Sequence, residues 1–129
     1  MNAETIHTKK KMILVVDDSL IARRMVRFAL QGLDCEILEA FDGTAAVRIL
    51  YSQPVDLLIT DLNMPNMNGM ELSRIVRDSH GMNDMPIIML TQEDGPKQRE
   101  EARQVGVSLL MSKPFTPEQI FGLVKEILG

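Results

Sequence analysis

Tryptophan is absent from the sequence, and only one tyrosine and one cysteine, Cys35, occur among its 129 residues. A lone cysteine cannot form an internal disulfide, so we expect a core-stabilised fold in a reducing compartment, the cytoplasm. No apolar stretch approaches the ~20 residues of a membrane-spanning helix, which argues against a membrane protein. The net charge of -4 gives no reason to expect binding to nucleic acid or to anionic membranes.

The length fits one domain and leaves little room for a second. Residues 1–10 are expected to form a flexible N-terminal tail, because this segment is polar and lacks the apolar stretch of a signal peptide. Residues 11–129 are expected to form the single domain.

Short apolar runs alternate with segments of helical spacing along this domain. The apolar runs predict strands over residues 12–16, 35–39, 55–60, 85–90 and 107–111. Helices are predicted to begin near Ser19, Asp42, Gly69, Pro96 and Thr116, where capping residues, glycine or proline stand. Five strands alternating with five helices predict an α/β fold, a doubly wound parallel sheet with helices on both faces.

The pattern also predicts which residues face the core. The residues of the first helix expected to face inward are Ile21, Met25, Phe28 and Ala29. Its arginines, Arg23, Arg24 and Arg27, are expected on a solvated face near the site, where a kinase could contact them. The second strand alternates polar and apolar residues and suits an edge, whereas the other four are nearly continuous apolar runs that suit buried central strands.

Polar groups of complementary kinds stand where the predicted strands end. Asp17 and Asp18 follow the first strand, Asp61 the third, Thr91 the fourth and Lys113 the fifth. The carboxyl ends of parallel strands form the ligand-binding edge of such a sheet, so these side chains should converge. Three clustered carboxylates require a divalent cation, and hard oxygen ligands with room for water favour Mg²⁺. Asp61 is the candidate nucleophile on a phosphoryl group whose oxygens Thr91 and Lys113 would bind.

Four motifs carry a resemblance to a known family. They read LVVDDS at 14–19, DLNMPNMNG at 61–69, LT at 90–91 and KPF at 113–115. With these motifs the sequence resembles the receiver domain of two-component response regulators, of the single-domain chemotaxis or CheY type, from about residue 11 to 128. The resemblance implies a flavodoxin/CheY-like fold with five helices and a five-stranded parallel sheet of order 2-1-3-4-5.

The resemblance also implies roles for individual residues. The implied site consists of the phosphoacceptor Asp61, the metal-binding Asp17, Asp18, Asp61 and backbone carbonyl of Asn63, and the phosphoryl-binding Thr91 and Lys113. Asp18 would bind Mg²⁺ directly, whereas Asp17 would hold a metal-bound water. The Lys113–Pro114 peptide would be cis.

Some positions depart from the family pattern or vary within it. Leu110 stands where the family commonly has an aromatic residue that swings inward, which leaves open whether that switch operates. Gln92 replaces a small residue beside Thr91 and could narrow access to the acceptor. Asn63 and Glu93 occupy positions that border the hydrolytic water in the family, and with Gln92 they are expected to tune rates.

We therefore expect a response regulator that accepts a phosphoryl group on Asp61 from a histidine kinase or phosphotransfer protein and is not a turnover enzyme on an external substrate. Phosphorylation would rearrange the face of the fourth helix, fifth strand and fifth helix, which would bind a protein target in chemotaxis or motility. The fourth helix has only Ala102 and Val105 as clear apolar anchors, so it is either simply solvated or held loosely enough to shift. A monomer is expected, with dimerisation on phosphorylation left open.

Alternative functions remain open. The chain could be the receiver fragment of a larger transcription regulator, a relay intermediate or a phosphate sink, although no DNA-binding segment is expected after Gly129. An interaction module that keeps only the fold would have lost acidic or lysine positions, and all are present. A phosphatase with its nucleophile on the first strand would need a second acid two residues after Asp17, where Ser19 stands.

Overall fold

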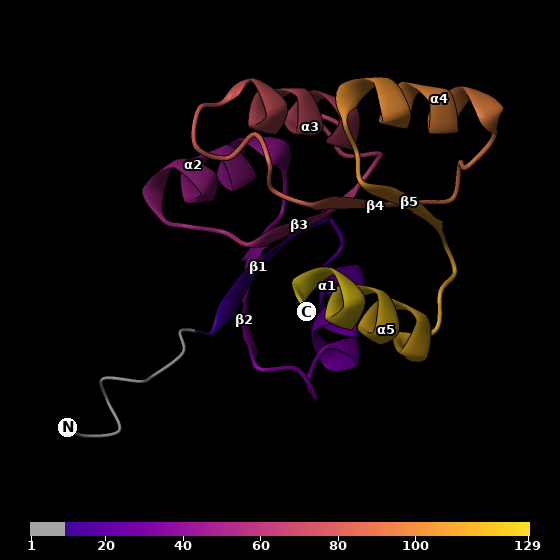
Figure 1. Cartoon of the computed structure of the whole chain (residues 1–129). Coiled ribbons are helices and arrows are strands. Elements are labelled where there is room, and N and C mark those ends of the chain that lie inside the picture. The colour runs from indigo at the N-terminus through magenta and orange to yellow at the C-terminus, as the bar shows by residue number, and fades with distance from the viewer. Residues whose placement is uncertain (1–9) are drawn as a thin grey trace.

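A computed structural model gives the structure of the chain and describes residues 10–129, so the expected tail lies almost wholly outside the described residues. Strands and helices alternate along the chain (Figure 1). The strands are β1 (Lys11–Val16), β2 (Cys35–Ala40), β3 (Leu57–Asp61), β4 (Ile87–Thr91) and β5 (Leu109–Ser112). The helices are α1 (Leu20–Ala29), α2 (Gly43–Ser52), α3 (Gly69–Asp78), α4 (Pro96–Val105) and α5 (Pro117–Leu128). The strands predicted from 55, 85 and 107 each begin two residues later.

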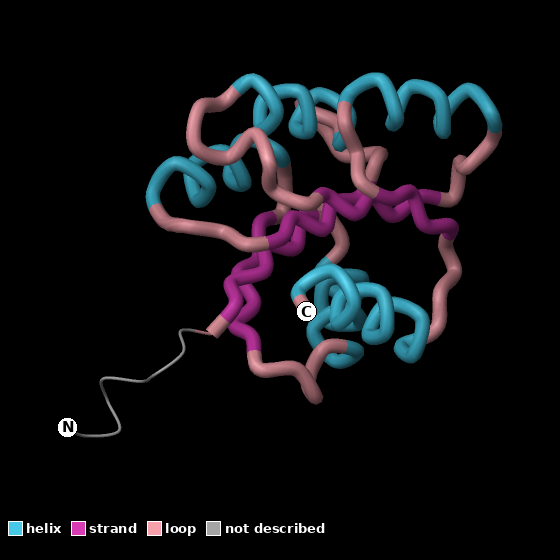
Figure 2. The backbone as a smooth tube through the Cα atoms, in the orientation of Figure 1, coloured by secondary structure: helices cyan, strands magenta, loops and turns pink. Residues whose placement is uncertain are grey.

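The strands form one parallel sheet of order β2-β1-β3-β4-β5. The helices α1 and α5 lie together on one face of this sheet, and α2, α3 and α4 cover the other (Figures 1 and 2). The predicted doubly wound α/β fold and its strand order are confirmed. The order makes β1 and β3 neighbours, so the residues that follow them meet at one edge. Within residues 10–129, no helix has the length and apolar character to cross a bilayer.

Local sequence signals set where most helices begin. The side chains of Ser19, Asp42, Asn68 and Thr116 each accept a hydrogen bond from a backbone N–H in the first turn of the following helix. Each such bond satisfies a donor that the helix itself leaves unpaired. The helix α4 has no side-chain cap and starts with Pro96, so its beginning is fixed less firmly.

The core has a part on each side of the sheet. One apolar cluster lies between the sheet and α1 and α5, and a second lies between the sheet and α2 and α3. A smaller cluster attaches α4 and consists of Leu62, Met70, Met89, Ala102 and Val105. Ala102 and Val105 are the buried residues of α4, as predicted.

The predicted inward face of α1 is wrong for three of its four residues. Ile21, Met25 and Phe28 are 73%, 53% and 63% exposed, and only Ala29 is buried. The helix carries two apolar stripes, and the one that packs on the sheet contains Val26 and Ala29. Because both stripes have helical spacing, periodicity could not choose between them. The stripe with the smaller side chains faces inward, and the larger side chains are left at the surface.

The fifth strand is also not a buried central strand, contrary to its apolar sequence. It lies at the edge of the sheet and pairs with β4, and Leu109 is 38% exposed. The other edge is β2, as predicted. The apolar run of β5 has a different cause: Met111 packs against the α1–α5 cluster, and Leu110 packs against the cluster that attaches α4.

Two truncations of similar size, at Ile21 of α1 and at its C-cap residue Leu30, test which side of the helix packs on the sheet. Leu30→Ala is expected to lower the free energy of unfolding by about 2–5 kcal/mol, because Leu30 is 1% exposed and its truncation leaves a cavity. Ile21→Ala should change it by less than ~0.5 kcal/mol, because most of the side chain already contacts water. Denaturant unfolding measures both values, and equal losses would contradict the assignment.

Candidate functional site

Three acids meet at the carboxyl edge of the sheet. Asp17 and Asp18 directly follow β1, and Asp61 is the last residue of β3. The two strands are paired with Val16 opposite Thr60, so the acids that come next stand at the same level. Each of the three acids offers an oxygen within 4.8 Å of the others. The convergence predicted for these residues is therefore present.

Lys113 reaches this group from the far edge of the sheet. Its Nζ lies 3.3 Å from Oδ2 of Asp17 and 3.3 Å from Oδ1 of Asp61. Its backbone N–H donates to the carbonyl oxygen of Thr91 at 2.8 Å, which fixes the origin of the side chain. The Lys113–Pro114 peptide is cis, as expected. The ammonium thus lies between carboxylates from two different strands.

Burial and neighbouring charges shift two pKa values at the site. Burial raises the pKa of Asp61; Lys113 opposes this and Asp17 adds to it, so the pKa stays above its ordinary value. For Lys113, burial disfavours the charged form, but Asp17 and Asp61 outweigh it and raise the pKa. The lysine therefore remains an ammonium, and it faces the Asp61 carboxylate, whose charge is disfavoured by its surroundings.

The two acids of the pair have different surroundings. Asp17 is 5% exposed: its Oδ1 accepts a hydrogen bond from the N–H of Ser19 at 2.9 Å, and its Oδ2 faces Lys113. Asp18 is exposed. A carboxylate already bound on both oxygens is less available to a cation than an open one. Asp18 is thus the more accessible carboxylate of the pair, and its role as the direct metal ligand stays a prediction.

The donor set fits a divalent cation. Three carboxylates face one ammonium, so the group carries excess negative charge that is costly without a further cation. The oxygens lie at a partly open edge that leaves room for the waters Mg²⁺ retains. Asn63 follows Asp61 by two residues and is exposed, and the role of its carbonyl as a ligand stays a prediction.

Thr91 ends β4 and is 1% exposed. Its Oγ1 accepts a hydrogen bond from the N–H of Glu93 at 2.9 Å. Its own proton has only a long contact, 3.4 Å, with the carbonyl oxygen of Glu93. The hydroxyl therefore faces the β4–α4 loop and has a weakly engaged donor that another acceptor could capture.

The predicted rate-tuning residues are all exposed positions near the acids. Asn63 and Glu93 are joined by a 2.7 Å hydrogen bond from Nδ2 to Oε1. Gln92 lines a hollow of about 410 Å³ together with Asp17 and Lys113. Their effect on any rate stays a prediction.

Leu110 is partly buried beneath α4. It packs against the apolar cluster that contains Ala102 and Val105, the two anchors of that helix. The position where the family commonly has a mobile aromatic residue thus carries a side chain that supports α4 by apolar contact alone.

Two residues that contact the site were not predicted from the sequence to do so. Gly69 begins α3 against the end of β3, and a Cβ there would overlap the carbonyl oxygen of Asp61. The glycine that closes the 61–69 motif was the visible signal for this close contact. Arg23 was expected on a solvated face, but its side chain is 14% exposed and donates to the carbonyl oxygen of Asp17. Nothing in the local sequence distinguishes it from Arg24 and Arg27.

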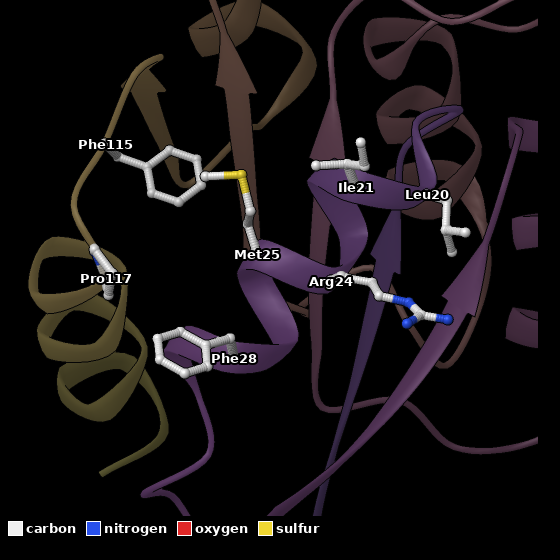
Figure 3. A pocket seen from close by; sticks show the side chains of 7 residues that line it. All are labelled: Leu20, Ile21, Arg24, Met25, Phe28, Phe115 and Pro117. Atoms are coloured by element: carbon white, nitrogen blue, oxygen red, sulfur yellow. The ribbon is translucent and has the colours of Figure 1, made fainter.

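A large apolar surface lies beside the acids, which we call the α1 apolar surface. Its residues are Leu20, Ile21, Met25 and Phe28 of α1 with Phe115 and Pro117, and they surround a hollow of about 440 Å³ that Arg24 also lines. Met25 and Phe115 point toward each other across the gap between α1 and the chain leading into α5 (Figure 3). Both also line the hollow that contains Asp17 and Lys113, so the surface is continuous with the acid site. Exposed apolar patches of this kind mark interaction surfaces.

A doubly wound parallel sheet with acids at β1 and β3 and a lysine after β5 defines a class of α/β receiver domains. The family described as the response regulator receiver domain matches residues 13–125. The chain belongs to this family, as a receiver domain of the CheY type. The resemblance stated from the sequence motifs is confirmed.

Named relatives and solved structures support this assignment. A "Chemotaxis protein CheY homolog" of Campylobacter jejuni is 42% identical over 119 residues, 91% of this chain and 92% of that protein. "Chemotaxis protein CheY" of Pseudomonas aeruginosa is 39% identical over 116 residues, 89% and 94% of the two chains. The structure of the chemotaxis response regulator CheY4 of Vibrio cholerae matches with a TM-score of 0.86 and 34% identity, covering 92% of this chain and 99% of that one.

Removal of the ammonium tests the contact between Lys113 and Asp61. Lys113→Met is expected to raise the pKa of Asp61 further, because burial and Asp17 are then opposed only by the hydrogen bond from the N–H of Leu62. An Asp61 pKa above its unfolded value means that its contribution to stability falls as pH rises from the unfolded-state to the folded-state pKa. Carbon-13 titration of the Asp61 carboxyl without Mg²⁺ measures the shift. Lys125→Met, at an exposed position of α5, is the control, and an unchanged or lower Asp61 pKa in the Lys113 variant would contradict the contact.

Proposed function

We propose that this receiver domain accepts a phosphoryl group on Asp61 from a histidine kinase or a phosphotransfer protein. The observation that carries the proposal is the 3.3 Å contact of Lys113 with Asp61 inside a cluster of three acids. A carboxylate held beside an ammonium and two further acids suits a reaction that brings phosphoryl oxygens and needs added positive charge.

The chemistry follows from the placement of these groups. A carboxylate oxygen of Asp61 would attack phosphorus, forming an O–P bond while the bond from phosphorus to the donor nitrogen breaks and its electron pair leaves with the donor. Lys113 would bind one oxygen of the transferred group, and the Thr91 hydroxyl would donate to another. When held by Asp17, Asp18 and Asp61, Mg²⁺ would neutralise charge on the transferring group. The protein is then a phosphoacceptor and not a turnover enzyme on an external substrate.

The signal would leave the site through the β4–α4 loop. A phosphoryl group on Asp61 would attract the weakly engaged proton of Thr91, whose oxygen is bonded to Glu93 of that loop. The next element, α4, has two buried residues and no side-chain cap at its start, so a small loop displacement can shift it. The face of α4, β5 and α5 would then bind a protein target.

The names of the relatives point to the setting. Since proteins 39–42% identical to this chain are named for chemotaxis, we propose that its output acts in chemotaxis or motility through a protein target. We also expect the protein in the cytoplasm and as a monomer, with dimerisation on phosphorylation left open. A role as relay intermediate or phosphate sink uses the same acceptor, and a partner-binding measurement on the phosphorylated chain would distinguish it.

Labelling with a small phosphodonor tests the acceptor. Incubation with phosphorus-32 acetyl phosphate and Mg²⁺ is expected to give a hydroxylamine-labile label that Asp61→Asn abolishes. The control is Asp34→Asn, which removes an exposed acid in the turn before β2 and should label as the unaltered chain does. A label that persists in Asp61→Asn would contradict the assignment of Asp61 as the phosphoacceptor.

A second variant tests whether Asp18 binds Mg²⁺. Asp18→Ala removes the exposed acid of the pair and is expected to lower Mg²⁺-dependent labelling at least 10-fold, because the remaining carboxylates hold the cation poorly. Labelling is measured across a Mg²⁺ titration. Undiminished labelling at low Mg²⁺ would show that Asp18 is not a ligand.

A further inference from the structure

The guanidinium group of Arg23 connects three elements at the acid site. Its Nη1 donates to the backbone carbonyl oxygen of Asp17 at 2.6 Å, and its Nε donates to Oε1 of Glu39 on β2 at 2.9 Å. The side chain itself comes from α1 and is 14% exposed. One group thus joins the end of β1, the body of α1 and the edge strand β2.

We propose that Arg23 is a positioning residue, which holds the Asp17–Asp18 segment in the geometry that binds the metal. This inference rests on the proposed function, because it concerns the same acids. Arg23 touches neither a metal ligand's carboxylate nor the acceptor, and it acts through the backbone of Asp17.

The other hydrogen bonds of Asp17 show why the bond from Arg23 to its carbonyl oxygen matters. Its N–H donates to the carbonyl oxygen of Ala40 at 3.1 Å, which attaches the residue to β2. Its carbonyl oxygen accepts from Arg23, and its Oδ1 caps the N–H of Ser19 at the start of α1. With the peptide groups on both sides held, the carboxylate can turn only about its side-chain bonds. Without Arg23, the peptide that joins Asp17 to Asp18 would lose this constraint, and both acids would move.

Glu39 keeps the guanidinium of Arg23 in place. It also accepts hydrogen bonds from Arg27 at 2.9 and 2.7 Å. Burial opposes the charge of Glu39, but the bonds from Arg27 and Arg23 outweigh it and hold the pKa below its ordinary value. The carboxylate therefore stays charged and orients the fork of Arg23 toward Asp17.

Arg27 provides a matched control. It shares the partner Glu39 and donates in addition to the carbonyl oxygen of Ile37 at 3.2 Å. Its side chain is 48% exposed, and none of its hydrogen bonds goes to Asp17. Arg23→Gln removes one cation and one hydrogen bond to Glu39, and Arg27→Gln removes one cation and two such bonds. Only the first variant removes the bond to the acid pair.

Two measurements on the full chain distinguish the variants. Calorimetric titration gives the Mg²⁺ dissociation constant, which we expect to rise about 10-fold in Arg23→Gln and to stay within twofold of the unaltered chain in Arg27→Gln. Amide hydrogen exchange without metal should accelerate at Asp17 relative to Leu58 of the central strand β3 in Arg23→Gln only. The ratio of the exchange rates of these two amides distinguishes local loosening at Asp17 from a general loss of stability.

The inference would be overturned if the two variants had the same Mg²⁺ dissociation constant or the same exchange ratio. An arginine that only stabilises the fold would not change the Asp17–Asp18 segment more than the rest of the chain. If Arg23→Gln does not fold, Arg23→Lys, which keeps the charge but cannot bridge both oxygens with a rigid fork, decides the question by the same measurements. Failure of the unaltered chain to bind Mg²⁺ would contradict the proposed function instead, and the exchange ratio would still decide the role of Arg23.

Discussion

The meeting of three carboxylates with one ammonium is the constraint on which the rest of the structure depends. Asp61 and the pair Asp17–Asp18 can be neighbours only because β1 and β3 are paired in the sheet. Lys113 must cross from beyond β4 to reach them, and its backbone bond to Thr91 sets its starting point. The parallel sheet is thus more than a scaffold, since its strand order decides which charges face one another.

Most of the fold and the convergence of the site residues could be predicted from the sequence. Apolar runs ended by acids marked the strands, and the strand order implied by the family resemblance made β1 and β3 neighbours, so that Asp17 and Asp61 meet. The orientation of α1 could not be predicted, since Met25 and Val26 belong to two stripes with the same period. The contacts of Arg23 could not be predicted either, because its partner Glu39 lies on β2 and only folding brings the two residues together.

The acid site and the helix α4 differ in how firmly they are held. Asp17 is hydrogen-bonded through its N–H, its carbonyl and its carboxylate. The helix α4 is attached by its buried Ala102 and Val105, by one exposed ion pair with α3, and by a hydrogen bond from Arg77 to the carbonyl oxygen of its C-cap residue. Leu110 adds apolar contact beneath this helix without any directional bond. A firmly held acid site beside a helix with few attachments is the arrangement in which the proposed phosphorylation could become a movement.

The α1 apolar surface lies beside the acid site, and contacts made by these two regions respond in opposite ways to solution conditions. Binding through Ile21, Met25 and Phe28 removes apolar area from water, so excluded salts such as sulfate strengthen it and cooling weakens it. Contacts with the exposed charges of the acid site are screened as ionic strength rises. A partner that touches both regions would therefore keep its affinity across a range of ionic strength, while one that touches only the acids would lose it.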